Sequence, residues 1–190
     1  MSSVLIDDKW YLFGGTISAI ENSSNMWCFD FTKEEWSLIR PSNNVTLPTL
    51  DSHTSCVYKD KQGKNYIITF GGFIGGEFGE YWNQILVFDV ENKKWKVPYT
   101  EEDGIQVQDP KAPSIRCGHS ATIYNDKMYV FGGTNGEVRY NDMWIYDLIN
   151  ESWETIKLKE NPPVRYSSSK SLPNLPIIAK KWTYKCCIQR

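Results

Sequence analysis

The chain has 190 residues and a formal net charge of −2, so its overall charge gives no reason to expect nucleic acid or an anionic membrane as a partner. Hydrophobic residues make up 41% of the sequence, which is enough for a buried core, yet no apolar run approaches the ~20 residues that span a bilayer. The sequence begins without the pattern of a secretory signal and its five cysteines lack framework spacing, so we expect a cytoplasmic protein.

The first part of the chain contains short runs of aromatic and β-branched residues that are separated by polar turns. We expect a first unit over residues 4–39. Its four predicted strands cover, in order, residues 4–6, 9–13, 26–30 and 36–39. Such runs across short polar turns are typical of antiparallel hairpins.

Two further units follow the first, at residues 50–98 and 114–158. The predicted strands of the second unit are residues 53–58, 65–70 and 85–89 and a strand that starts at Trp95. Those of the third are residues 119–124, 128–131 and 143–147 and a strand that starts at Trp153. The chain is therefore a repeat protein whose units are alike in order and register.

The same landmark residues mark each unit. A pair of glycines ends the second strand, an aspartate ends the third, and a tryptophan lies six residues after the aspartate. These landmarks are Gly14, Gly15, Gly71, Gly72, Gly132 and Gly133, then Asp30, Asp89 and Asp147, then Trp36, Trp95 and Trp153. The constant spacing predicts a tight turn in which the carboxylate accepts backbone N–H groups.

The third unit resembles the kelch repeat nearly throughout. The matching residues are Arg116, Gly118, His119, Ser120, Phe131, Gly132, Gly133, Asn141, Asp142, Trp144, Tyr146, Asp147 and Trp153. The second unit has Leu50 in place of the arginine and Asn83-Gln84 in place of Asn-Asp, and the first lacks the opening motif. The resemblance implies an all-β fold, a partial kelch-type β-propeller of about three four-stranded antiparallel blades.

The repeat pattern is incomplete at the end of the sequence. We expect kelch repeats over residues 1–169, of which residues 163–169 open a fourth unit, and an atypical tail over residues 170–190. Three blades are too few for a propeller ring, which has about 4–8. The hypothesis is a fragment, a truncated product or a mis-predicted gene model of a larger propeller. The alternative is that additional blades come from a second chain.

The two histidines occupy the same place in their units. Because His53 and His119 are repeated by position, a buried and hydrogen-bonded structural role is favoured over catalysis. No H-x3-5-H, C-x2-C or H-E-x-x-H spacing is present. Thr49 and Ile115 stand where the iron motif of the similar plant specifier proteins needs an acidic residue. We expect no catalytic residue, no metal and no cofactor.

Variable loops on a regular scaffold are where binding usually resides. The loops between second and third strands are residues 16–25, 73–82 and 134–140. The candidate partner-binding residues are Phe78, Tyr81, Arg139 and Tyr140, together with Arg116 and Arg165, which the resemblance implies face the central pocket. The tyrosines could instead pack between blades, and that alternative stays open.

These features predict a non-catalytic protein–protein interaction module, a kelch-repeat scaffold or adaptor whose partner is another protein. The partner's identity is not encoded in the repeat. The alternative is a fragment of a kelch-type propeller enzyme, or of an enzyme-associated subunit, whose catalytic residues lie outside this chain.

Overall fold

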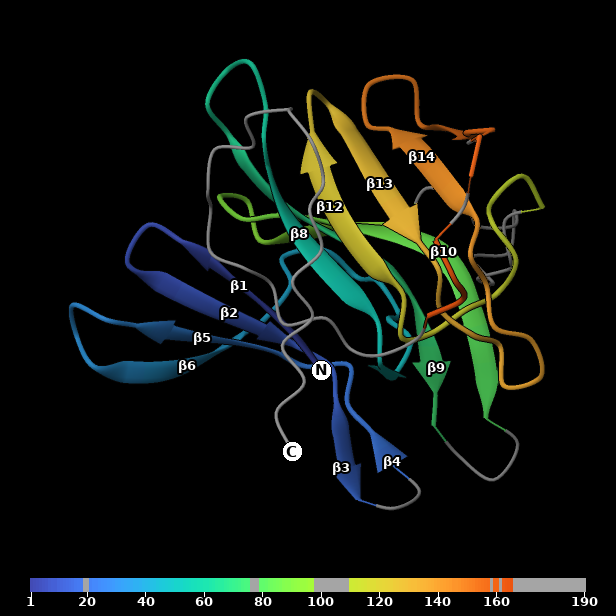
Figure 1. Cartoon of the computed structure of the whole chain (residues 1–190). Helices are drawn as coiled ribbons and strands as arrows, with labels where there is room; N and C mark the ends of the chain where they lie inside the picture. Colours follow the sequence, from blue (N-terminus) through green and yellow to red (C-terminus); the bar gives the residue numbers. More distant parts are fainter. Residues whose placement is uncertain (19–20, 76–78, 98–109, 158, 161, 166–190) are drawn as a thin grey trace, which may run out of the picture.

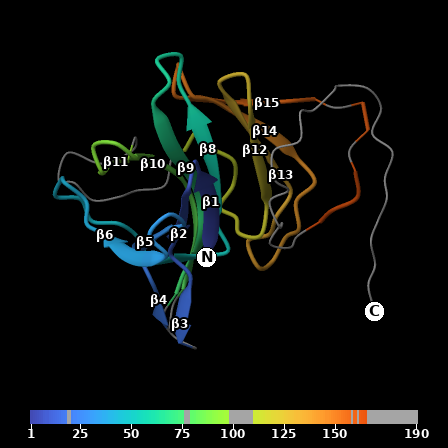
Figure 2. The ribbon, with the colours of Figure 1, turned by 90° about the vertical axis from the view of Figure 1, so that its left-hand side faces the viewer.

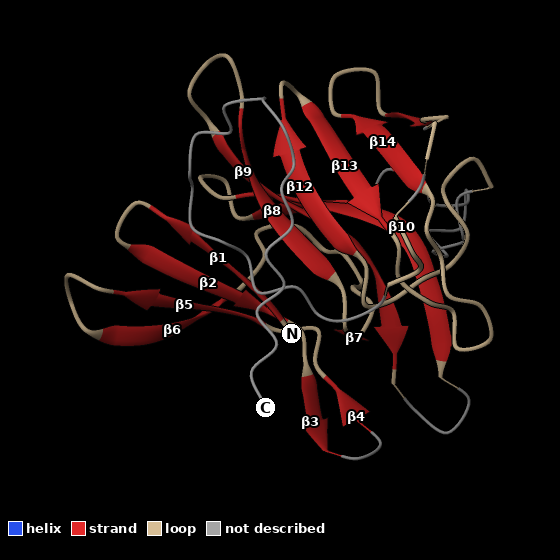
Figure 3. Ribbon diagram, in the orientation of Figure 1, coloured by secondary structure: helices blue, strands red, loops and turns tan. Residues whose placement is uncertain are grey.

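The computed structural model describes residues 1–18, 21–75, 79–97, 110–157, 159–160 and 162–165 (Figure 1). The described residues form antiparallel β-sheets and contain no helix (Figure 3). No helix in the described part of the chain could span a membrane. The expected all-β class is confirmed, and the sheets are arranged as a partial β-propeller of three blades.

The first blade is a four-stranded sheet in the order β1-β2-β5-β6. Its strands are β1 (Ser2–Ile6), β2 (Lys9–Phe13), β5 (Met26–Asp30) and β6 (Glu35–Ile39). The first strand begins two residues earlier than the sequence suggested. A small hairpin of β3 (Thr16–Ser18) and β4 (Glu21–Asn22), which the sequence analysis did not predict, projects from one end (Figure 1).

The second and third blades repeat this arrangement. The second contains β7 (Leu50–Asp51), β8 (Thr54–Lys59), β9 (Asn65–Ile74), β10 (Glu80–Asp89) and β11 (Lys94–Lys96), with both β7 and β8 paired to β9. The third contains β12 (Ser120–Tyr124), β13 (Lys127–Phe131), β14 (Met143–Asp147) and β15 (Ser152–Thr155). Residues 163–165 follow the third blade, and the rest of the expected fourth unit, 166–169, and the tail, 170–190, lie outside the described residues.

The first strands of the blades lie side by side at the inner edge of the assembly. β1 contacts β8, and β8 contacts β12, so the three sheets fan outward from these strands (Figure 2). Successive blades therefore pack face to face. We call the face of a blade that is turned to the next blade in the chain its downstream face, and the opposite one its upstream face.

Two hydrophobic cores fill the spaces between blades. In the first, the downstream face of the first blade, with Tyr11 and Phe13, packs on the upstream face of the second, with Phe88 and Trp95. In the second core, the downstream face of the second blade packs on Met128, Val130 and Tyr146 of the third. The side chains alternate along each strand, so the sheet of the second blade is buried on both faces.

The glycine pairs attach each blade to the start of the next unit. The second glycine of each pair donates its N–H to a backbone carbonyl, in the bonds Gly15 to Leu50 (2.8 Å), Gly72 to Arg116 (2.9 Å) and Gly133 to Arg165 (2.9 Å). These three carbonyls occupy the same repeat position. At Gly132, φ is +69° and an added Cβ would lie 2.8 Å from the carbonyl oxygen of Arg165, so only glycine fits there without strain.

The aspartates that end the third strands organise the turns that follow. Asp30 Oδ1 accepts from the N–H groups of Thr32 (3.0 Å) and Lys33 (3.2 Å). Asp147 Oδ1 accepts from those of Ile149 (2.9 Å) and Asn150 (2.8 Å). Asp89 accepts from Asn92 in the same way (3.0 Å). These contacts give the constant spacing from aspartate to tryptophan a physical cause.

Candidate functional site

The three loops between second and third strands lie at one end of the blades (Figure 1). The first loop contacts the second, and the second contacts the third. Asn22 of the first loop is buried and donates from Nδ2 to the carbonyl of Phe73 in the second loop at 3.1 Å. Tyr81 of the second loop packs on Gly136 of the third, where an added Cβ would lie 2.6 Å from the tyrosine hydroxyl. We call residues 16–18, 21–25, 73–75, 79–82 and 134–140 together the loop face.

Apolar side chains are exposed on two of the loops. Ile17 is 63% exposed in the first loop and Val138 is 51% exposed in the third, where Arg139 is also exposed. Exposed apolar groups beside an arginine are the composition expected of a protein-contact surface. Neither Ile17 nor Val138 was predicted from the repeat pattern, because both lie in loops whose length and sequence vary between the units.

Side chains within the third loop hold its conformation. Thr134 Oγ1 donates to the carbonyl of Val138 at 2.8 Å and accepts from the N–H of Gly136 at 3.0 Å. Asn135 Oδ1 accepts from the N–H of Val138 at 2.8 Å. A loop that is held in this way loses little conformational entropy when a partner binds.

The two tyrosines of the predicted set are half-buried. Tyr81 lies against Phe73, with ring centroids 5.0 Å apart, and burial raises the pKa of the Tyr81 phenol. Tyr140 lies under the guanidinium of Arg116, 4.3 Å from the ring centroid. Both rings thus pack within the scaffold while part of each stays accessible. Phe78, the remaining aromatic candidate, lies outside the described residues.

Arg116 was expected to face the central pocket, but its side chain is fully buried. The guanidinium donates to both carboxylate oxygens of Asp142, at 2.8 and 2.9 Å, and to the carbonyl of Gly132 at 2.8 Å. Although burial opposes ionisation of Asp142, the hydrogen bonds and charge of Arg116 hold the pKa of that carboxyl below its usual value. Arg116 therefore links parts of the third blade and is not available to a partner within this structure.

Arg165 and Arg116 share a repeat position but differ in exposure. The side chain of Arg165 is exposed, while its backbone carbonyl accepts from Gly133. In the second blade the same position is Leu50, which is fully buried, and Gln84 takes the place of Asp142. The second blade thus replaces both members of the ion pair by uncharged residues.

Both histidines are buried between blades. Burial lowers the pKa of each to about 3, so both rings are neutral at pH 7. His119 Nε2 lies 2.8 Å from Thr54 Oγ1 in the preceding blade. The carbonyls of Phe13 and Asp51 lie where they favour protonation of His53, yet neither ring nitrogen of His53 makes a hydrogen bond of good geometry.

The cysteines of the described chain, Cys28, Cys56 and Cys117, are free thiols, and Cys28 is buried. Burial raises the pKa of Cys56 to about 12 and that of Cys117 to about 11, so these thiols are protonated and poorly nucleophilic. Among the described residues, no three His, Cys, Asp or Glu side chains gather where they could hold a metal ion.

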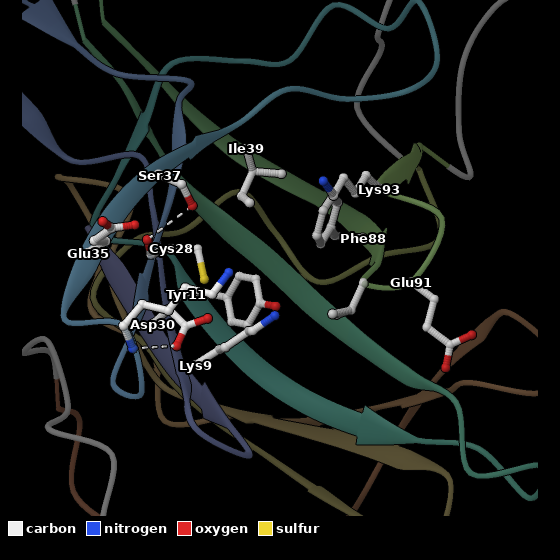
Figure 4. Close-up of a pocket in the computed structure, with 12 residues that line it drawn as sticks. Lys9, Tyr11, Cys28, Asp30, Glu35, Ser37, Ile39, Phe88, Glu91 and Lys93 are labelled. Atoms are coloured by element: carbon white, nitrogen blue, oxygen red, sulfur yellow. Dashed lines mark hydrogen bonds between the residues drawn. The ribbon is translucent and has the colours of Figure 1, made fainter.

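A groove of about 480 Å³ separates the outer parts of the first and second blades (Figure 4). Tyr11, Cys28 and Phe88 contribute apolar lining, and Lys9 and Asp30 lie among the charged groups around it. Burial raises the pKa of the Cys28 thiol and raises that of the Tyr11 phenol to about 12, so neither group is activated for chemistry. The groove lies away from the loop face, toward the aspartate turns.

Comparison with known proteins identifies the repeat. The family model described as the KLHDC2/KLHL20/DRC7 Kelch-repeats domain matches residues 1–178 of this chain. Host cell factor 1 of Rattus norvegicus is 32% identical over 144 residues, in an alignment that covers 68% of this chain and 6% of that protein. Kelch domain-containing protein 3 of Bos taurus is 30% identical over 163 residues, in an alignment that covers 80% of this chain and 38% of that protein.

A fungal protein shows similar but weaker identity. Tip elongation aberrant protein 1 of Schizosaccharomyces pombe is 28% identical over 148 residues, in an alignment that covers 76% of this chain and 12% of that protein. In each of these comparisons the matched region is well under half of the relative's length.

Proposed function

This chain belongs to the kelch-repeat family, and from that premise we propose that it is a non-catalytic module that binds another protein through its loop face. The observation that carries the proposal is the pair of exposed apolar side chains, Ile17 on the first loop and Val138 on the third. Both of these loops contact the second loop, the first through Asn22 and the third through Tyr81. A rigid surface with apolar groups and a neighbouring arginine suits a folded protein partner.

The proposed contact set differs from the one that the repeat pattern suggested. It contains Ile17, Val138 and Arg139, with the accessible edges of Tyr81 and Tyr140. It excludes Arg116, whose charge is satisfied inside the blade by Asp142, and it does not depend on Phe78. The neutral histidines and protonated thiols support a role without catalysis.

Free cysteines in the described chain support a reducing compartment, and we propose the cytoplasm as the site of action.

The test is quantitative capture of binding proteins from a cell extract by the immobilised chain. We expect the double variant Ile17→Asp, Val138→Asp to lose most of the proteins that the wild type retains, because the apolar contacts are replaced by charges. The matched control is Ile149→Asp, whose side chain is 59% exposed at the opposite end of the third blade. Equal capture by the double variant and the control would contradict the assignment of the loop face.

A further inference from the structure

The groove between the first and second blades combines a buried floor with accessible apolar walls. Its most buried lining residues are Tyr11, Cys28 and Phe88, which are at most 7% exposed. Ile39 of the first blade and Val90 of the second also line it and are only half-buried. Its volume of about 480 Å³ is typical of sites that bind a ligand. The groove can therefore bury an apolar group that enters from outside.

Two lysines direct positive charge into this groove. Figure 4 shows the ends of the Lys9 and Lys93 side chains pointing into it. The carboxylates of Glu35 and Glu91 point away from it in the same view. Burial raises the pKa of the Cys28 thiol, and the charges of Lys9 and Lys93 act in the opposite direction, so both ammonium groups lie near the floor. The interior of the groove is therefore apolar and positively charged.

The corresponding gap between the second and third blades is bridged by an ion pair. There Lys96 of the second blade meets Glu151 of the third. Ser37 of the first blade occupies the position of Lys96, because each directly follows the tryptophan of its blade. Lys93 occupies the position of Glu151, because each lies in the turn four residues after the aspartate. Their backbones agree, with φ of +53° at Lys93 and +50° at Glu151.

The gap between the first and second blades lacks the acidic member of such a pair. Ser37 is short and uncharged, and its hydroxyl donates to the carbonyl of Cys28 in its own blade at 3.4 Å. Within the part of the chain that the structure describes, neither Lys9 nor Lys93 forms an ion pair. Asp30 Oδ1 accepts from N–H groups of the turn that follows it. The two lysines therefore favour a carboxylate that comes from outside the groove.

We propose that this groove is a second protein-contact site, separate from the loop face, and that it binds a partner segment in which an acidic side chain lies next to an apolar one. The apolar side chain contacts Ile39 and Val90. The carboxylate accepts hydrogen bonds from the ammonium groups of Lys93 and Lys9 and supplies the negative charge that this gap lacks. Because the walls are partly apolar, water screens this ion pair less than one on an open surface.

The test is a titration of the 190-residue chain with the blocked peptide acetyl-Gly-Leu-Glu-Leu-Gly-amide, followed by NMR of the isoleucine and valine methyl groups. The glutamate side chain is the only carboxylate of this peptide. We expect saturable shifts of the methyl signals of Ile39 and Val90, while those of Ile17 and Val138 on the loop face stay in place. The matched peptide with glutamine in place of glutamate should bind several-fold more weakly, because it cannot pair with the lysines.

Substitutions on both walls test the role of the charge. Lys93→Gln should weaken binding of the glutamate peptide several-fold and remove most of the difference between the two peptides. The matched control is Lys94→Gln, which removes the same charge from a residue on the other face of the second blade and should bind as the wild type does. Ser37→Glu places a carboxylate opposite Lys93 and should compete with the peptide. Ser37→Gln, which is similar in size but neutral, should bind the peptide more tightly than Ser37→Glu.

Four outcomes would overturn the proposal. The methyl signals of Ile39 and Val90 could stay unchanged, or they could shift equally with both peptides, in which case no carboxylate is recognised. Shifts confined to Ile17 and Val138 would place the peptide on the loop face, so the proposed function would survive while the groove site would not. Sodium hexanoate could produce the same shifts at a lower concentration than the peptide does, and the groove would then be a site for small amphiphilic acids and not for a partner segment.

Discussion

The imidazole of His119 in the third blade lies 2.8 Å, at Nε2, from the hydroxyl oxygen of Thr54 in the second blade. This hydrogen bond joins the starts of two inner strands, β8 and β12, where the blades are closest together. The equivalent pair one blade earlier is different, because Ser2 takes the place of Thr54 and its hydroxyl instead lies 2.6 Å from that of Ser55. His53 is left without that partner.

The stability of the protein should decrease as the pH falls below about 6.5. Burial lowers the pKa of His53 and His119 to about 3 in the folded state, so only the unfolded chain binds these protons between that value and 6.5. Each histidine should then reduce the free energy of unfolding by roughly 1 kcal/mol per pH unit. Urea titrations from pH 7 to pH 5 measure this slope. A His119→Phe variant should lose about half of it.

Thr54, whose hydroxyl group bonds to His119, provides the control for this prediction. Thr54→Val removes the hydrogen bond to His119 but leaves the imidazole buried, so it should lower stability by about 1 kcal/mol while the pH slope is retained. A slope that is the same in the wild type and in His119→Phe would mean that the buried histidine is not the source of the acid sensitivity.

The ion pair between the fully buried Arg116 and the partly exposed Asp142 predicts a large and unequal response to substitution. Asp142→Ala leaves the fully buried guanidinium of Arg116 without its counter-charge and should cost about 3 kcal/mol or more. The double variant Arg116→Leu, Asp142→Gln installs the residues that the second blade uses, Leu50 and Gln84. We expect it to be more stable than Asp142→Ala in chemical denaturation, because no charge is left buried. A double variant less stable than Asp142→Ala would contradict this account.

The fold could be predicted from the sequence because the three units can be compared with one another. Three copies in register reveal which residues belong to the scaffold, since Gly, Asp and Trp recur where turns and packing require them. Exposure could not be predicted in this way. Trp36 and Trp95 occupy the same repeat position, yet Trp36 is 48% exposed and Trp95 is 4% exposed, because only Trp95 is covered by another blade.

For the same reason, the repeat pattern did not predict the exposed residues of the loop face or the burial of Arg116. Ile17 and Val138 lie in loops whose length and sequence vary between the units, so no periodicity indicated them. The burial of Arg116 depends on Asp142, which lies 26 residues later and becomes its neighbour only when the blade folds. A motif that marks an arginine does not reveal whether the carboxylate beside it already neutralises the charge.

The cysteine thiols should react slowly while the chain is folded. Burial raises the pKa of Cys56 to about 12 and that of Cys117 to about 11, which leaves little thiolate at pH 8. Labelling with a maleimide, followed by peptide mass spectrometry, gives the rate at each site. We expect the rate at Cys56 to rise steeply through the unfolding transition in urea. Rapid labelling of Cys56 in native buffer would show that the space between the second and third blades is open.

The glycine pair of the third blade gives a prediction about backbone geometry. Gly132→Val should unfold the blade or lower its stability severely, because φ is +69° and the new Cβ would meet the carbonyl oxygen of Arg165 at 2.8 Å. The control is Gly63→Ala in an exposed turn. There φ is +87° but the nearest atom to a new Cβ is Lys59 Cε at 3.8 Å, so only the backbone strain of about 1 kcal/mol applies. Thermal unfolding curves that shift equally for the two variants would show that close approach of the chain at Gly132 is not what requires glycine.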